Sequence, residues 1–425
     1  MESIKIGILG MGNIGTGLYK ILQINDEKIK NYANKKIEVK KVLVKNFEKQ
    51  RDVDIPKELL TLDVDEIIYD PEIKIIVELI GGINPAYDYL KRSIESGKHV
   101  VTANKAVIAT FGKELDDLAV KHGVQIKFEG SVGGGIPIIN TLTESLSANE
   151  IEEIVGIING TTNYILTQMS EFGMDFETAL KEAQIKGFAE ADPTSDLEGE
   201  DAVFKLAILS AVAFNKRVYP DEISREGIKK ISQKDIKYAS ELGYKIKLLA
   251  TAKKYGNNLE LNVHPALIPN KHPLASVNNE FNALFIRGNA VGEVMLYGKG
   301  AGSMPTGSAV LGDVLSIIKA IETDGIKNSN NNITSKLVVN NIGQSKYYVR
   351  LEVVDEPGVL GKIAINFGKY GVSLESVVQR ARGEKTVPLV FITHETDREK
   401  LDKALEEISS FSVVDKIASI LKVEE

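Results

Sequence analysis

The chain opens Ile4-Lys5-Ile6-Gly7-Ile8-Leu9-Gly10-Met11-Gly12-Asn13-Ile14-Gly15. A short run rich in β-branched residues predicts a strand, and it leads directly into the pattern G-x-G-x-x-G formed by Gly10, Gly12 and Gly15. The first glycine allows a tight turn, the second lets the backbone approach a pyrophosphate, and the third lets a helix pack on the strand. The N-terminus of that helix offers free N–H groups to an anion. The stretch predicts a dinucleotide site, the alternative being a plain strand–helix turn.

Strand-like and helix-like segments alternate beyond this motif. Further strands are expected at residues 37–44, 75–80, 98–102 and 125–128, and helices at 15–22, 87–96 and 113–121. This alternation is typical of a parallel sheet with helices on both faces. Residues 1–130 are therefore predicted to form an α/β, Rossmann-type doubly wound domain that binds NAD(P).

The pattern changes after a Gly/Pro-rich break at 133–137. A helix at 138–146 and strands at 151–158, 245–252 and 259–265 predict an α+β domain over residues 131–323. An amphipathic helix at 309–321 is expected to return to the first domain. Residues 324–346 are polar and turn-prone, as in a linker. Residues 347–425 follow the order βαββαβ of a ferredoxin-like unit.

Composition narrows the classes of function. The 425 residues suggest about three domains. With 52 basic and 59 acidic residues and a net charge of −7, bulk positive charge does not favour a nucleic-acid partner. The absence of cysteine excludes disulfides and thiolate chemistry. No apolar run approaches ~18 residues and no secretory segment is evident, so we expect a cytoplasmic protein without a membrane partner. The five histidines lack metal-ligand spacing, which leaves acid–base chemistry to Lys, Asp or Glu.

The end of the second predicted strand bears on the choice of cofactor. A site selective for NAD usually carries a carboxylate there, which holds the ribose 2′-hydroxyl. This chain has Lys45 at that point, and a cation suits a 2′-phosphate. We expect NADP to be preferred with NAD usable, unless Lys45 is simply a solvated lysine.

Lys105 closes the segment Thr102-Ala103-Asn104-Lys105, directly after a predicted strand. Ligands of parallel sheets bind beyond the carboxyl ends of the strands. Lys105 is therefore expected to face the cofactor crevice, the alternative being a surface lysine.

The segment 187–207 contains the second lysine of interest. Ser195 and Glu198 have the spacing of a capping box, which predicts a helix beginning at Ser195. In that helix Asp201 and Lys205 share one face, and Lys205 lies within an apolar run. Lys205 is either a catalytic group with tuned proton affinity or one half of a surface ion pair.

Carboxylates crowd the approach to this helix, at Glu190, Asp192, Asp196 and Asp201. A substrate bearing an ammonium group would explain so many acidic residues in a short segment. A solvated acidic loop is the alternative.

Taken together, these motifs resemble the homoserine dehydrogenase family. The resemblance covers residues 4–320 and includes the glycine pattern, 102–105, 129–137, 156–164, the acidic segment through Lys205, and 298–306. Residues 347–425 resemble an ACT domain, which implies a regulatory unit. For the α+β domain of residues 131–323 the resemblance implies catalysis and dimerisation. The resemblance implies reversible reduction of L-aspartate 4-semialdehyde by NAD(P)H to L-homoserine, a step toward threonine and methionine.

The resemblance also implies roles for single residues. Lys205 would be the acid–base residue, Lys105 would line the nicotinamide and substrate site, Glu190 would bind substrate, and Asp196 and Asp201 would shape the pocket and hold the substrate ammonium. Cofactor contacts would come from Gly10, Gly12, Asn13, Ile14, Gly15, Lys45, Gly81, Thr102, Lys105 and Gly300. A sodium or potassium ion would be held by the Glu129 carboxylate and the carbonyls of Val132, Gly134 and Ile136.

The resemblance has two departures and one regulatory implication. Many members of the family have Arg-Asp where this chain has Lys45-Asn46, and commonly a proline where it has Lys299. The ACT-like unit implies an amino-acid effector, L-threonine, bound at a turn that includes Asp355, Gly358, Val359 and Leu360. A homodimer or homotetramer is expected.

Two other functions remain open from the residues alone. A dehydrogenase of the 3-phosphoglycerate type with an ACT domain would need a catalytic histidine paired with a carboxylate, and no histidine lies in such a motif. A non-catalytic sensor of nucleotides and amino acids would keep the glycine loop but would not need Lys205.

Overall fold

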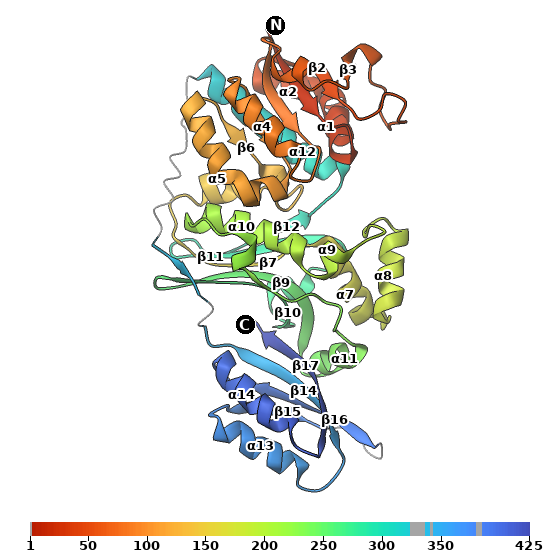
Figure 1. Ribbon diagram of the computed structural model, residues 1–425, viewed down its shortest axis with the longest axis vertical. Helices are drawn as coiled ribbons and strands as arrows, with labels where there is room; N and C mark the ends of the chain where they lie inside the picture. Colours follow the sequence, from red (N-terminus) through yellow and green to blue (C-terminus); the bar gives the residue numbers. More distant parts are fainter. Residues whose placement is uncertain (1, 324–335, 341–342, 380–384) are drawn as a thin grey trace. The chain divides into compact units, whose positions relative to one another are not determined.

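A computed structural model describes residues 2–323, 336–340, 343–379 and 385–425 (Figure 1). The chain forms two compact units. One is built from residues 1–152, 204–223 and 282–336, and the other from residues 153–203, 224–281 and 337–425. Each unit therefore combines segments that lie far apart in the sequence.

The first unit contains a six-stranded sheet with the order β3-β2-β1-β4-β5-β6. Its strands are β1 (Ser3–Leu9), β2 (Lys36–Leu43), β3 (Leu60–Thr61), β4 (Ile73–Glu78), β5 (His99–Thr102) and β6 (Ile126–Lys127). All neighbours pair in parallel. This confirms the predicted Rossmann-type sheet. The strand order reverses between β1 and β4, and ligands of such sheets bind at that point.

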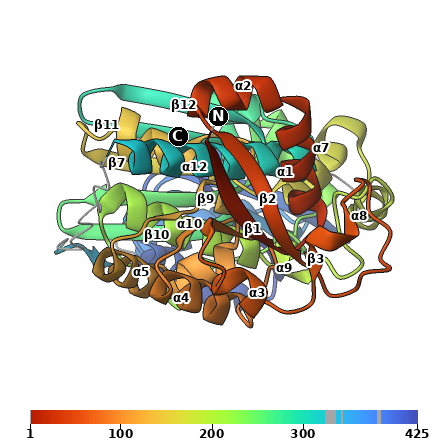
Figure 2. The same ribbon diagram turned by 90° about the horizontal axis from the view of Figure 1, so that it is seen from above.

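Helices cover both faces of this sheet (Figure 2). On one face lie α1 (Asn13–Ile24), α2 (Asp26–Ala33) and α12 (Ser303–Glu322); on the other lie α3 (Asp65–Ile68), α4 (Ala86–Glu95) and α5 (Lys105–His122). Each face of the sheet has its own hydrophobic core. In β4, Ile75 and Val77 lie in the core with α1 and α12, and Ile73 and Ile76 lie in the core with α4 and α5. Both faces are buried, which explains the nearly continuous apolar strands.

Helix α12 packs on the six-stranded sheet of the first unit, as the sequence predicted for residues 309–321. Its residues Val310, Val314 and Ile317 are buried in the same core as Ile6 and Ile8. Among the described residues, α12 is the one helix long and apolar enough to cross a membrane by length and composition. Its packing in this core accounts for that composition.

The first unit contains further elements beside the sheet. The predicted helix at 138–146 is a short α6 (Ile138–Asn140) that continues into a π-helical turn, η3 (Thr141–Ser145). Strands β11 (Phe281–Gly288) and β12 (Gly292–Lys299) are neighbours in a sheet and were not anticipated.

The second unit centres on two long antiparallel strands, β9 (Tyr244–Tyr255) and β10 (Asn258–Pro269). Strand β7 (Ile151–Ile157) pairs with β9, and β8 (Ser224–Arg225) pairs with β10. The helices of this part are α7 (Gly160–Phe172), α8 (Phe176–Ile185), α9 (Thr194–Leu197), the start of α10 (Glu200–Phe214) and α11 (Gln233–Glu241).

The C-terminal part of the second unit has the predicted βαββαβ order. It comprises β14 (Lys346–Val354), α13 (Val359–Lys369), β15 (Leu374–Val378), β16 (Thr386–Thr393), α14 (Arg398–Ser409) and β17 (Val414–Val423). Its strands are ordered β17-β14-β16-β15, and a core that includes Tyr347, Phe367 and Phe391 lies under the two helices. The ferredoxin-like prediction is confirmed.

Two features connect this ferredoxin-like sheet to the rest of the second unit. Strand β17 pairs in parallel with β10 at Ala266 and Leu267, and the N–H of Glu424 donates to the carbonyl of Leu267 at 2.8 Å. Part of the predicted linker is also ordered, because β13 (Val338–Val339) pairs with β10. Residues 324–335 and 341–342 of that linker lie outside the described residues.

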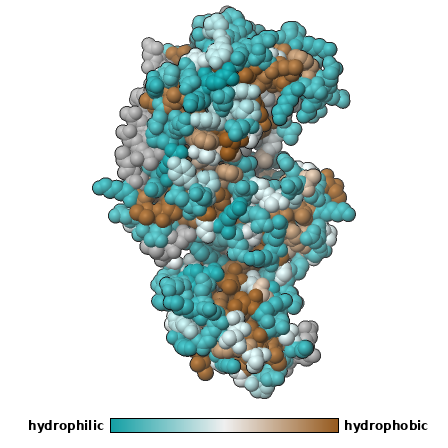
Figure 3. Space-filling model, in the orientation of Figure 1, coloured by the Kyte–Doolittle hydropathy of each residue, from teal (hydrophilic) through white to brown (hydrophobic). Residues whose placement is uncertain are grey.

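The face of the molecule in Figure 3 is mostly hydrophilic, with smaller hydrophobic patches. Individual exposed apolar side chains, such as Ile185 and Ile365, are common on protein surfaces.

Candidate active site

The three glycines after β1 have the geometry that a dinucleotide loop requires. Gly10 has φ of 103°, and a side chain there would lie 2.9 Å from the carbonyl of Leu79. Gly12 is the N-cap of α1, with nothing within 4 Å of the position that a Cβ would occupy. A Cβ on Gly15 would lie 2.6 Å from the carbonyl of Gly10. The loop thus has open space above Gly12 and uncapped N–H groups in the first turn of α1, which fit a pyrophosphate.

A buried carboxylate organises the carboxyl ends of β4 and β5. The hydroxyl of Thr102 donates to Glu78 Oε2 at 2.6 Å, and the N–H of Ile80 donates to Oε1 at 2.6 Å. Burial raises the pKa of Glu78. Gly81 follows in a left-handed conformation. This network fixes the loop after β4 beside the glycine loop, at the switch point of the sheet.

Lys105 is the first residue of α5 and is half-buried. Asn104 caps that helix: its Oδ1 accepts from the N–H of Val107 at 3.3 Å, and its Nδ2 donates to the carbonyl of Gly82 at 2.6 Å. The structure therefore places Lys105 at the carboxyl end of β5, where the sequence predicted it.

Lys45 is exposed two residues beyond β2. A second cation lies in the same loop. Arg51 donates from Nη2 to the carbonyl of Asn46 and from Nη1 to that of Lys49, both at 2.8 Å. Its Nε is buried and has no hydrogen-bond partner among the described residues. The loop that would meet a ribose 2′-substituent thus carries Lys45 and Arg51.

The acidic segment differs from the prediction in one respect. The helix expected to begin at Ser195 is two helices, α9 and α10, separated at Glu198 and Gly199. Gly199 has φ of 80°, a left-handed conformation that ends α9. No capping box forms at Ser195; instead Asp192 Oδ1 accepts from the N–H of Thr194 at 3.1 Å. The prediction of a single capped helix is therefore wrong.

Asp201 and Lys205 nevertheless lie one turn apart on α10, and both are buried, with 5% and 9% of their surface exposed. Asp196 is half-buried on α9, and Glu190 is exposed in the loop before it. The Nδ2 group of Asn159 donates to Asp196 Oδ1 at 2.6 Å and to Asp201 Oδ2 at 2.9 Å. The structure thus brings the carboxylates of Asp196 and Asp201 together, and sequence reasoning missed the asparagine that joins them.

Glu129 is buried in the first unit, at the start of the loop that carries Val132, Gly134 and Ile136. Its two carboxylate oxygens accept from the N–H groups of Ile139 and Asn140, each at 2.8 Å.

A second carboxylate, Asp313 of α12, accepts from the N–H of Glu129 at 2.8 Å. Burial raises the pKa of Glu129 and raises that of Asp313 to about 7. Neither forms an ion pair with a Lys, Arg or His within the part of the chain that the structure describes. Two buried acidic oxygen groups without a basic partner suit a hard cation.

Gly300 lies against the loop that follows Glu129. The N–H of Gly135 donates to the carbonyl of Lys299 at 3.1 Å, and a Cβ on Gly134 would lie 2.5 Å from the carbonyl of Gly300. Because the two turns are in close contact, Gly134 has no room for a side chain, and Gly300 has none because Asn282 lies beside it. The side-chain amide of Asn282, beside Gly300, is buried and has no hydrogen-bond partner in the described part of the chain.

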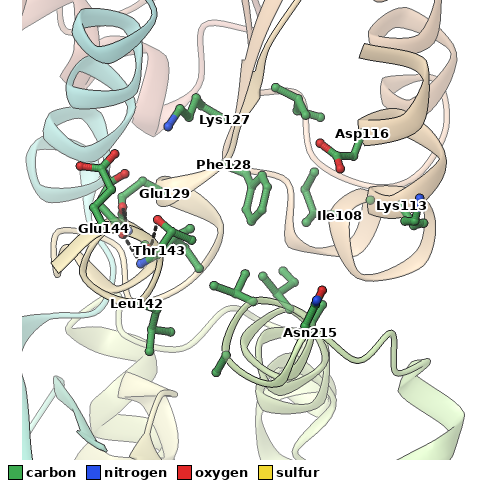
Figure 4. A pocket seen from close by; sticks show the side chains of 18 of the residues that line it. Ile108, Lys113, Asp116, Lys127, Phe128, Glu129, Leu142, Thr143, Glu144 and Asn215 are labelled. Carbon is green, nitrogen blue, oxygen red and sulfur yellow. Dashed lines mark hydrogen bonds between the residues drawn. The ribbon is translucent and has the colours of Figure 1, made fainter. Parts of the chain in front are cut away.

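A cavity of about 530 Å³ lies within the first unit, beside α5, η3 and the second half of α10 (Figure 4). Ile108, Asp116, Phe128 and Asn215 line it, and Glu129 lies at its edge. Glu129 is the one predicted site residue in its wall.

The turn between β14 and α13 carries the predicted effector residues. Gly358 has φ of 93° and is the N-cap of α13, with no side chain capping the helix and open space above its Cα. Asp355 and Leu360 are exposed, and Val359 is buried. Free N–H groups at this helix start, with a carboxylate nearby, suit the two charged groups of an amino acid.

These features define a class of protein. A dinucleotide loop at the switch point of a parallel sheet is one feature of a nicotinamide-nucleotide-dependent oxidoreductase. A buried lysine on α10 and the carboxylates clustered on α9 and α10 are another, and a ferredoxin-like unit follows in the chain.

Comparison with known proteins identifies the family. The family models that match are "Homoserine dehydrogenase, NAD binding domain" over residues 10–129, "Homoserine dehydrogenase" over 137–315 and "ACT domain" over 347–412. The chain is 41% identical to a homoserine dehydrogenase of Bacillus subtilis, over 100% of this chain and 99% of the relative. It is 44% identical to one from Synechocystis, over 99% of each. The chain belongs to the homoserine dehydrogenase family.

Solved structures agree. A homoserine dehydrogenase from Thiobacillus denitrificans has a TM-score of 0.92 and 38% identity, and covers 100% of this chain and 99% of its own. A hyperthermophilic archaeal homoserine dehydrogenase, solved in complex with NADPH, has a TM-score of 0.62 and 28% identity, and the match covers 74% of this chain and 97% of that one. The protein is therefore an oxidoreductase with a nicotinamide-nucleotide-binding domain and a C-terminal ACT domain.

Proposed function

We propose that the protein catalyses the reversible NAD(P)H-dependent reduction of L-aspartate 4-semialdehyde to L-homoserine, toward threonine and methionine. The observation that supports this most directly is the buried pair Asp201 and Lys205 on α10, with Asp196 held beside Asp201. The names of the relatives agree with it.

Hydride delivery to an aldehyde carbon builds negative charge on the oxygen. In this proposal the ammonium of Lys205 stabilises that charge and then gives its proton to the oxygen. Lys105 orients substrate against the nicotinamide. Glu190 binds the substrate, and Asp196 and Asp201 shape the pocket and hold the substrate ammonium.

The test is a coupled assay on the purified protein with L-homoserine and NADP, and in reverse with aspartate semialdehyde and NADPH. Lys205→Ala should lower kcat by roughly 10²–10⁴-fold, the usual effect of losing a general acid, while NADPH binding is retained. Lys181→Ala, at an exposed lysine of α8, is the control. Near-normal turnover of Lys205→Ala would refute the assignment, and an inactive wild-type protein would refute the reaction.

We further propose that NADP is preferred over NAD, because Lys45 and Arg51 lie where a 2′-phosphate would meet the loop after β2. Lys45→Asp should reverse or flatten the ratio of kcat/KM for the two cofactors. Lys28→Asp makes the same change of charge at an exposed position of α2, and it should leave the ratio of kcat/KM unaltered. If the ratio of kcat/KM for the two cofactors is the same in Lys45→Asp as in the wild type, Lys45 does not contact the cofactor.

A sodium or potassium ion at Glu129 is a third proposal, supported by the pair of buried carboxyls. The ion would be held by the carboxylate and by the carbonyls of Val132, Gly134 and Ile136. The thermal midpoint of the protein should rise with NaCl or KCl more than with tetramethylammonium chloride, and Glu129→Gln should abolish the difference. Equal effects of the three salts on the wild type would argue against the ion.

For the ACT domain, which implies a small-molecule effector, we propose L-threonine, bound at the turn of Asp355, Gly358, Val359 and Leu360. Inhibition requires that threonine bind the less active arrangement more tightly. Asp355→Ala should weaken the response to threonine, whereas Asp415→Ala, at another exposed carboxylate of the domain, should not. An intact enzyme that ignores threonine and shows no calorimetric heat with it would exclude this effector.

A cytoplasmic homodimer or homotetramer completes the proposal, and light scattering of the purified protein measures the oligomer directly.

A further inference from the structure

Asn159 joins the two aspartates of the candidate site. It follows β7 and is the N-cap of α7, where its side chain accepts from the N–H of Thr162 at 2.9 Å. The opposite end of the same amide donates to Asp196 Oδ1 and Asp201 Oδ2, at 2.6 and 2.9 Å. Only 5% of its surface is exposed. A single side chain thus connects a helix start to two carboxylates that arrive from α9 and α10.

The hydrogen bonds fix which way the amide faces. The backbone N–H of Thr162 can only donate, so the side-chain atom that it contacts must be the oxygen. The NH₂ group must then face the carboxylates, which accept when ionised. Each of its two hydrogens is used by one carboxylate, so the two carboxylates cannot turn away independently.

Two carboxylates at one site repel each other, and one of them tends to bind a proton. An amide that donates to both holds them at a set separation. The hydroxyl of Thr161 lies 2.9 Å from Asp196 Oδ2, so both oxygens of this carboxylate have a partner in α7 or at its N-cap.

We propose that Asn159 is a positioning residue for the reaction: it holds the carboxylates of Asp196 and Asp201 together in one arrangement for the substrate. This rests on the proposed function, because it gives those aspartates their role. Asn159 itself acts through them.

Asn159→Asp separates this role from helix capping. Aspartate is as good an N-cap as asparagine, so α7 keeps its cap, but the NH₂ donor is replaced by a third carboxylate. We expect kcat/KM for homoserine to fall by about 10²-fold, the size of effect that a misplacement of about 1 Å can cause. The acid limb of the kcat/KM profile should move to higher pH, because three clustered carboxylates share a proton more readily.

Asn159→Ser is the second variant, since serine also caps helices but is too short to reach both aspartates. It should lower kcat/KM with a smaller shift of the acid limb. Asp175→Asn exchanges the exposed N-cap of α8, which accepts from the N–H of Thr178, and should leave the kinetics unchanged.

Thermal unfolding and NADPH binding by fluorescence check that each variant is folded. An active wild type with unchanged kcat/KM and an unmoved acid limb in both Asn159 variants would overturn the positioning role. Loss of kcat/KM without any movement of the acid limb in folded Asn159→Asp would overturn it as well. An inactive wild type would instead refute the reaction itself.

Discussion

Lys247 is buried in β9, with 2% of its surface exposed. No carboxylate of the described residues is in hydrogen-bond contact with it. Its Nζ donates to the carbonyl of Val277 at 2.6 Å and to Oδ1 of Asn163 at 3.0 Å. Burial lowers its pKa to about 7. The unfolded chain, with an ordinary lysine pKa of about 10.4, binds more protons than the folded one between these values.

The free energy of unfolding should therefore rise with pH from about 7 to about 10.4 through this group. Lys247→Met removes the titrating group, so the stability of the wild type should increase relative to this variant as pH rises through that window. Urea denaturation at pH 7 and 9.5 measures the difference. A difference that stays constant between the two pH values would contradict the prediction.

Among single residues, the sequence predicted the roles of those whose function depends on their neighbours in the chain. Gly10, Gly12 and Gly15 act within one strand–turn–helix unit, so their spacing was enough. Asn159 was missed because its partner Asp196 is 37 residues away, and Asp313 because it meets Glu129 across 184 residues. Sequence spacing gives no sign of such contacts, although an aspartate on the apolar side of a predicted helix is itself an anomaly.

Helices α1 and α12 approach each other through glycines. A Cβ on Gly307 would lie 2.6 Å from the backbone N of Leu18, and one on Gly17 would lie 2.0 Å from the carbonyl of Ser303. Backbone atoms cannot move aside as flexible side chains do. Gly312, further along α12, has nothing within 4 Å of its Cβ position.

Gly307→Ala should therefore lower the thermal midpoint and weaken NADPH binding, because α1 carries the dinucleotide loop at its start. Gly312→Ala should raise the midpoint slightly, since alanine favours a helix over glycine by up to about 1 kcal/mol. Equal midpoints for the two variants would show that the helices can separate without cost.

Element types were predicted best where the pattern was long and regular. All strands of the nucleotide-binding sheet except the two-residue β3 were anticipated, together with every element of the ACT domain. The break between α9 and α10 was not, because it depends on the left-handed conformation of Gly199, which the apparent capping box concealed. Strands β11 and β12 were missed as well.

The whole molecule should be sensitive to acid through buried carboxylates of the second unit. Asp235 of α11 is fully buried and forms a two-contact ion pair with Arg350 of β14, at 2.8 and 3.1 Å. Burial by itself raises the pKa of Asp235, but hydrogen bonds from Arg350 and Ser232 outweigh it and hold the pKa below its ordinary value. A depressed carboxyl pKa stabilises the fold above the unfolded pKa, about 3.9, and that contribution is lost as pH falls through the folded pKa.

Asp235→Asn should cost up to about 3–5 kcal/mol at pH 7, because it breaks a buried ion pair and leaves Arg350 with Glu352 as its remaining carboxylate. The difference in the free energy of unfolding between this variant and the wild type should shrink below about pH 4, where Asp235 becomes protonated in the unfolded chain. Denaturant titrations at pH 7 and pH 3 measure both, and Glu399→Gln, at an exposed pair on α14, is the control. If the difference in the free energy of unfolding is the same at pH 3 as at pH 7, the Asp235–Arg350 ion pair is not the source of the acid sensitivity.

At the largest scale, the order of domains could be predicted but the composition of the compact units could not. The dinucleotide and ACT segments are local patterns. Residues 204–223 and 282–336 return to the first unit through tertiary packing. The hydrophobic pattern of a segment predicts its secondary structure but not the unit in which it packs.

The pairing of β17 with β10 has a practical consequence for anyone who shortens this chain. Removing residues 347–425 would take away the backbone partner of Ala266 and Leu267 and leave a buried, apolar strand edge open to solvent. Such edges recruit strands from other molecules. Lys253 would also lose its contact with Glu424. Precipitation of a truncated protein would therefore reflect the newly exposed strand edge and not the loss of an effector site. Point substitutions in the β14–α13 turn are the cleaner test of the proposed threonine response.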